Sequence, residues 1–124
     1  MDTTPKTTKE KLRHQFDAGE NSFLLILRCE LRWDWNAFYE LTSLMYDVAF
    51  DSQAESCFEK WVAEGFWYCD TWIKEWSSHP NFPAPEVGQH EKAIALLHDL
   101  AWFYFMQDDP YRDNTLEVNS RREV

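Results

Sequence analysis

Between Phe58 and Trp76 the apolar residues recur every three or four positions, and this spacing constrains the fold more than any other feature of the chain. An α-helix places residues with that spacing on one face. The members of the face are Phe58, Trp61, Val62, Gly65, Phe66, Cys69, Trp72, Ile73 and Trp76. Because Ser52 and Glu55 have the spacing of a capping box, the sequence predicts a long amphipathic helix that begins near Ser52.

Other segments also favour helices. Thr7 and Glu10 form a second capping-box pattern near the start of the chain. Asp34 or Asn36 can cap a helix whose apolar positions have helical spacing: Phe38, Leu41, Met45 and Val48. Three prolines make residues 77–85 a loop, and the last long helix is predicted from about Glu86 to Gln107. These patterns predict at least four helices.

Residues 25–33 have two interpretations, because the segment alternates apolar and polar residues as a strand does and also satisfies helical spacing. Helix is favoured, since a strand here lacks a convincing partner; a strand would make the fold α+β. A chain of 124 residues fits one domain, and its three glycines leave few sites for hairpin turns. We therefore predict a single all-α domain over residues 1–124, a bundle of four to five helices with mobile ends at about 1–6 and 112–124.

The acidic residues are concentrated in one part of the chain. The net charge is −10, and no basic residue lies between Arg32 and Lys60. On a helix, Glu40, Asp47 and Asp51 share one exposed stripe, which is either a solvated face or a surface for a partner. Such a surface repels nucleic-acid backbones and attracts a basic protein or nucleoprotein complex. Direct binding to nucleic acid is therefore not expected.

Trp67 lies opposite the apolar face of the aromatic helix, and Tyr68 lies at the edge of that face. Either another part of the chain, such as the tail after Tyr111, covers Trp67, or the ring belongs to an interface. Trp and Tyr are enriched at binding hot spots, so both residues are candidate anchors for a partner. Asp108 and Asp109 form a secondary acidic corner.

The second half of the last helix is apolar on every side, since Trp102, Phe103 and Met106 lie away from its main apolar face. A helix with this pattern is buried all round. Either the helix is central in the bundle or these three residues pack against another chain, which would make the protein a homodimer.

No pattern in the sequence indicates an enzyme. No catalytic motif is recognised, and the histidines lack the spacing of a metal site, so no cofactor and no metal are expected. The three cysteines include no CxxC pair, which together with the lack of a signal segment suggests the cytoplasm. The longest uncharged apolar run, Phe23 to Leu27, is too short to span a membrane.

Three functions fit these observations. The favoured one is a small acidic binding protein that docks on a basic surface of a partner and inhibits or regulates it, as immunity proteins, antitoxins and phage anti-defence proteins do. The first alternative is a homo-oligomeric structural or assembly protein that uses the last helix. The second is a helical pocket for a small apolar ligand, lined by Trp61, Trp72, Trp76 and Tyr104.

Overall fold

The structure is a computed structural model that describes residues 7–109, and every regular element in that range is helical. The elements are α1 (Thr8–Phe16), α2 (Phe23–Leu25), the π-helix η1 (Ile26–Glu30), α3 (Trp35–Asp51), the 3₁₀ turn η2 (Ser52–Ala54), α4 (Lys60–Ser77) and α5 (Val87–Met106). The predicted all-α bundle is confirmed. None of the described helices is long and apolar enough to cross a membrane. The ends predicted to be mobile lie outside the described residues.

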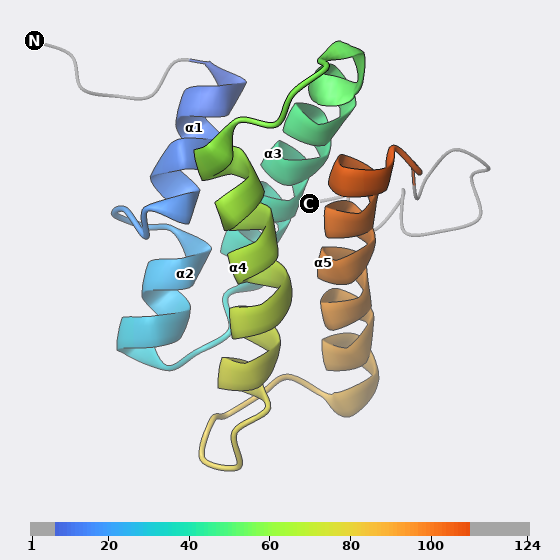
Figure 1. The fold of residues 1–124 in the computed structure, drawn as a ribbon. Coiled ribbons are helices and arrows are strands. Elements are labelled where there is room, and N and C mark those ends of the chain that lie inside the picture. The colour runs from blue at the N-terminus through green and yellow to red at the C-terminus, as the bar shows by residue number, and fades with distance from the viewer. Residues whose placement is uncertain (1–6, 110–124) are drawn as a thin grey trace, which may run out of the picture.

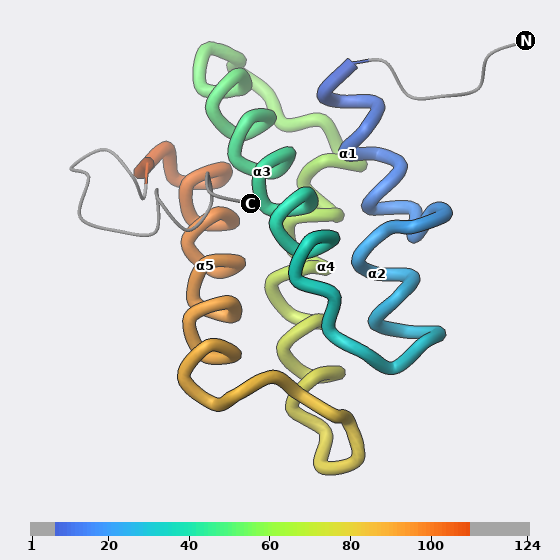
Figure 2. Tube along the Cα trace, turned by 180° about the vertical axis from the view of Figure 1, so that it is seen from behind, coloured from blue at the N-terminus to red at the C-terminus, as the bar shows by residue number. Residues whose placement is uncertain are grey.

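The helices form a bundle of four columns (Figures 1 and 2). Helices α1 and α2 follow one another along one column, and α3, α4 and α5 form the other three. The principal contacts between columns join α4 with α5, α1 with α3, and α3 with α5. In Figure 1, α4 lies in front of α3, and in the reverse view of Figure 2 α3 lies in front. The outer sides of α3 and α4 therefore face opposite sides of the molecule.

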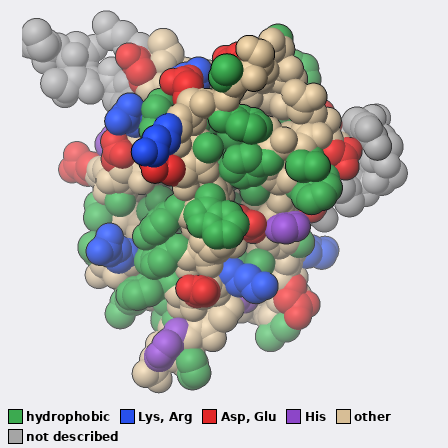
Figure 3. Space-filling view, viewed as in Figure 1, with side chains coloured by type: hydrophobic (Ala, Val, Ile, Leu, Met, Phe, Trp, Pro, Cys, Tyr) green, Lys and Arg blue, Asp and Glu red, His purple; other side chains and the backbone are tan. Residues whose placement is uncertain are grey.

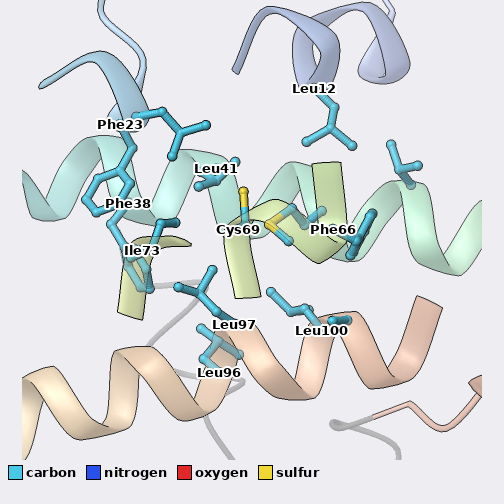
Figure 4. Packing of buried hydrophobic residues seen from close by; sticks show 14 of the residues in the cluster. Leu12, Phe23, Phe38, Leu41, Phe66, Cys69, Ile73, Leu96, Leu97 and Leu100 are labelled. Atoms are coloured by element: carbon cyan, nitrogen blue, oxygen red, sulfur yellow. The ribbon is translucent and has the colours of Figure 1, made fainter. Parts of the chain in front are cut away.

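The core lies along the bundle axis, where side chains from all columns meet (Figure 4). Phe66, Cys69 and Ile73 of α4 are completely buried, as their helical spacing predicts. The Phe66 ring stacks on the ring of Tyr104 of α5, with 4.5 Å between the centroids. Burial of this apolar surface is the main favourable contribution to folding.

Two of the predicted helix caps are present. The Thr7 hydroxyl accepts a hydrogen bond from the backbone N–H of Glu10 at 3.0 Å, and the Glu10 carboxylate accepts one from the N–H of Thr7 at 3.0 Å. The carboxylate of Asp34 accepts a hydrogen bond from the N–H of Ala37 at 3.0 Å and caps α3. Each cap satisfies a donor that the first turn of a helix leaves without a partner.

The strand interpretation of residues 25–33 is wrong, because the chain is helical from Phe23 to Glu30. Residues Ile26–Glu30 form a π-helix, whose turn is wider than that of an α-helix. Leu31 then adopts a left-handed conformation with φ of 53°, and this ends the helix. The short helix α2, which leads into η1, packs against α1 and α3.

The predicted start of the aromatic helix near Ser52 is also wrong. The Ser52 hydroxyl donates to the carbonyl of Ala49 at 3.1 Å, so Ser52 closes the end of α3 instead of capping the next helix. Helix α4 begins at Lys60. Phe58, which was predicted to lie on the apolar face, precedes the helix and is 57% exposed, although its ring contacts Tyr104 and Phe105.

Candidate functional site

Trp67 projects from the outer side of α4 and is 65% exposed. The next residue along a helix is rotated by about 100°, so the burial of Phe66 turns the side chain of Trp67 away from the core. Exposure of an indole ring to this degree is uncommon, because a side chain of that size gains much by burial. In the space-filling view, hydrophobic side chains gather over α4 and the columns beside it, with charged side chains among them (Figure 3).

Three aromatic rings form a continuous stack on the side of α4 that faces α1 and α2. Tyr68 stacks on Trp72 with 5.3 Å between the centroids, and Trp72 stacks on Trp76 at 5.2 Å. The indole N–H of Trp76 donates to the carbonyl of Leu27 at 3.0 Å and ties the stack to η1. The sequence assigned Trp72 and Trp76 to the core, but both rings are only partly buried.

Two hollows lie along this stack. The Arg28 hollow, of about 410 Å³, is lined by Arg13, Phe16, Asp17, Ala18, Leu24, Arg28, Trp61, Glu64, Gly65, Tyr68 and Trp72. The Phe82 hollow, of about 330 Å³, is lined by Leu31, Trp72, Glu75, Trp76, His79, Asn81 and Phe82. Trp72 lines both hollows, and we call the two together the aromatic groove.

The π-helix η1 and the residue that follows it contribute one side chain to each hollow. Arg28 lies within the π-helix and lines the first hollow, while Leu31, just after it, lines the second. π-helical turns occur frequently at functional sites. Partial burial raises the pKa of the Tyr68 hydroxyl, and the positive charge of Arg28 acts in the opposite direction. Arg28 itself makes no ion pair with any residue in the described range.

The acidic stripe lies on another side of the molecule. Glu40, Asp47 and Asp51 are exposed on α3, behind α4 in Figure 1. The stripe and Trp67 therefore lie on different sides of the molecule, because the helices that carry them face opposite sides of the bundle.

Part of the negative charge at the end of α3 is neutralised by a residue from α1. Lys9 forms ion pairs with Glu59 and, at 3.9 Å, with Glu55. The pKa of Lys9 is raised chiefly by its hydrogen bond with Glu59, and Asp51 adds to this effect. The sequence alone did not indicate this pairing, because no basic residue lies near Asp51 in the sequence and Lys9 is distant along the chain.

Asp108 and Asp109 accept hydrogen bonds within the chain. The Tyr46 hydroxyl donates to Asp109 at 2.8 Å, and the indole N–H of Trp102 donates to Asp108 at 3.3 Å. These bonds hold the residues after α5 against α3 and α5.

The three residues proposed for self-association do not form one surface. Trp102 and Met106 are 49% and 57% exposed, but Phe103 is only 2% exposed and packs against Tyr46 of α3 at 5.4 Å. Phe103 is thus a core residue, because α3 covers that side of α5. It is withdrawn from the candidate self-association surface.

The four residues that were predicted to line a pocket, Trp61, Trp72, Trp76 and Tyr104, do not share one lining. Tyr104 is buried against Phe66 in the core, whereas the three tryptophans line the aromatic groove. Only the tryptophan part of the proposed lining is available to a ligand.

The histidines that sequence analysis considered for a metal make separate contacts. His90 bonds to the Ser77 hydroxyl at 2.8 Å, and His98 lies 3.3 Å from the carboxylate of Asp70. Within residues 7–109 there is no group of three or more His, Cys, Asp or Glu side chains that could hold one metal ion.

The cysteines differ in their surroundings. Cys29 and Cys57 are exposed, while Cys69 is buried and burial raises the pKa of its thiol well above the usual range. We expect a disulfide reagent such as 5,5′-dithiobis(2-nitrobenzoic acid) to modify two thiols of the folded protein and the third only after unfolding. The stoichiometry at 412 nm, with and without denaturant, measures this. Rapid modification of all three thiols without denaturant would contradict the packing around Cys69.

No family model matches the sequence, and the comparisons found no match among curated proteins or solved structures.

Proposed function

We propose that the protein is a non-enzymatic binding protein that docks through the outer side of α4 on a partner protein and inhibits or regulates it. The observation that carries this proposal is the exposure of Trp67, whose neighbour in the sequence, Tyr68, lines the aromatic groove. A partner that covers Trp67 and enters the groove would bury several large aromatic surfaces at once. Residues of this type supply most of the affinity at protein interfaces.

The net charge supports a basic partner. At −10 the protein attracts positively charged proteins or nucleoprotein complexes and repels free nucleic acid. Because Glu40, Asp47 and Asp51 lie away from Trp67, we assign them to long-range steering rather than to direct contact. Their loss should therefore slow association more than it speeds dissociation.

The surroundings of the candidate nucleophiles support a role without catalysis. Ser77, the serine that bonds to His90, is only 1% exposed, and its hydroxyl also donates to the carbonyl of Ile73 at 2.7 Å. The Cys69 thiol is buried and held protonated. Neither group is both accessible and activated, as a nucleophile must be.

Replacement of Trp67 with alanine tests the proposal. We expect the free energy of unfolding to change by less than about 0.5 kcal/mol, since the ring is mostly exposed. Binding to the partner should weaken by more than about 1 kcal/mol, or roughly fivefold in Kd. The partner is first isolated from native lysate at low and at high salt, and its affinity for each variant is then measured by titration.

The matched control is Phe50→Ala, because Phe50 is 58% exposed on α3, away from the proposed surface. This variant should retain normal binding. Captured proteins that are no more basic than the background, with a recovery that is independent of salt, would contradict a basic partner. Equal effects of the two substitutions on binding would contradict the assigned surface.

Self-association is the second candidate function, favoured by the exposure of Trp102 and Met106 on adjacent turns of α5. A homodimer through this pair would give twice the monomer mass in light scattering, and a Trp102→Ala substitution would reduce it. A monomeric mass at high protein concentration would exclude this function.

A further inference from the structure

The two hollows of the aromatic groove differ in their charged residues. The Arg28 hollow is lined by Arg13 and Arg28 but also by Asp17 and Glu64, so its positive and negative charges offset each other. The Phe82 hollow is lined by one residue with a fixed charge, Glu75. Glu75 makes no ion pair with another described residue.

The remaining lining of the Phe82 hollow is mostly apolar or aromatic. Trp72 and Trp76 come from α4, Phe82 from the loop after α4, and Leu31 is the residue just after η1. The hydrogen bond from Trp76 to the Leu27 carbonyl fixes one of these rings in place. The site is therefore a hollow with aromatic walls beside a carboxylate.

We propose that the Phe82 hollow binds a cationic side chain, an arginine or lysine from a basic segment of the partner. This inference rests on the proposed function and specifies part of its interface. A guanidinium or ammonium group is attracted by the negative face of an aromatic ring, and Trp is the most favourable ring. The carboxylate of Glu75 adds an opposite charge at the same place.

The charge of the hollow decides between this occupant and the alternatives. An anionic group would meet Glu75 with no lysine or arginine in the lining to compensate its charge. An apolar side chain would fill the space but would remove water from Glu75 without supplying a hydrogen-bond donor, which is unfavourable. A cation on a long apolar stem satisfies the rings and the carboxylate together.

The hollow can be tested on the isolated protein with a defined probe. The probe is the peptide acetyl-Gly-Arg-Gly-amide, and its neutral counterpart carries citrulline, which has nearly the same shape without the charge. Both are titrated at constant ionic strength while the assigned indole N–H resonances of Trp72 and Trp76 are followed by NMR. We expect the arginine peptide to shift these resonances and to bind at least about fivefold more tightly than the citrulline peptide.

Two glutamate variants locate the effect. Glu75→Gln should reduce the affinity for the arginine peptide about fivefold, to near that of the citrulline peptide. Glu64→Gln, a matched exposed glutamate of α4 in the other hollow, should leave it unchanged. Equal binding of the two peptides, unchanged indole resonances, or equal effects of the two variants would overturn the proposal.

The outcome is independent of partner capture, because the probe requires no partner. If Trp67→Ala weakens binding of the partner but the arginine peptide does not bind, the proposal of docking through α4 is retained and the proposed site for a cationic side chain is rejected. If the peptide binds as expected but Trp67→Ala has no effect on the partner, the hollow is a cation site while the proposed docking surface is wrong.

Discussion

Replacement of Phe66 with alanine should lower the free energy of unfolding by about 3–5 kcal/mol, which is the usual effect of removing a buried phenylalanine. Phe66 is completely buried, stacks on Tyr104 at 4.5 Å and meets the edge of Phe16 at 5.9 Å. The substitution removes these ring contacts and leaves a cavity between α4, α5 and α1. A loss of this size is a large fraction of the stability of a typical small domain. The midpoint of urea unfolding measures it, provided that the slope is unchanged.

The adjacent residue supplies the control for this prediction. Trp67→Ala removes a larger side chain than Phe66→Ala but should have little effect on unfolding, because Trp67 is exposed. A loss of several kcal/mol for Trp67→Ala, with a small one for Phe66→Ala, would mean that α4 is rotated about its axis by roughly one residue. Similar decreases in the free energy of unfolding for both variants would mean that the outer side of α4 is covered in the folded protein.

Apolar spacing was sufficient to predict the helices that pack along the bundle. Helix α5 ends at Met106, one residue before the predicted end, and Asp34 caps α3 as expected. The start of α4 could not be predicted in this way, because a serine hydroxyl can bond either to a backbone N–H that follows it or to a carbonyl of the preceding turn. The Ser52 hydroxyl bonds to the preceding helix, and a sequence pattern does not reveal that choice.

The aromatic groove was not predicted, although four of the aromatic residues that line it were singled out from the sequence: Trp61, Tyr68, Trp72 and Trp76. Helical spacing places Trp72 and Trp76 on the same broad face as Ile73, yet Ile73 is buried while the tryptophans lie at the edge of that face. Whether an edge residue is covered depends on the neighbouring column. Here that column is a short helix continued by the π-helix η1, and its wider turn was not foreseen. The Phe82 wall also depends on how the proline-containing loop folds back.

The relative positions of the charged side chains could not be predicted without knowledge of the topology. The acidic stripe was correctly expected to be exposed, but the sequence could not say that α3 and α4 face opposite sides. Nor could it bring Lys9 to Glu55 and Glu59, since the spacing rules for ion pairs apply only within one helix. Both arrangements result from the packing of columns that are distant along the chain.

Gly65 is a position where local propensity and packing give opposite expectations. In the middle of an exposed helix, a change from glycine to alanine stabilises by about 1 kcal/mol, since alanine restricts the unfolded chain and favours the helix. Gly65 is buried, however, and a Cβ atom there would lie 2.0 Å from the ring of Phe16. That ring is held between Trp61 and Phe66, at 6.3 and 5.9 Å. The absence of a side chain at residue 65 therefore allows α1 to approach α4.

We expect Gly65→Ala to lower the free energy of unfolding by about 2 kcal/mol, because so close a contact puts the overpacking cost near the upper end of about 1–3 kcal/mol, and helix propensity offsets about 1 kcal/mol of it. Gly88→Ala is the matched control: Gly88 lies in α5, and no atom lies within 4 Å of a Cβ built there, so this change should be neutral or stabilising. In a Phe16→Ala background the penalty at residue 65 should disappear, which a double-mutant cycle in urea measures. Stabilisation by Gly65→Ala in the parent protein would show instead that the Phe16 ring moves into the Arg28 hollow at little cost, and that the contact between α1 and α4 is loose.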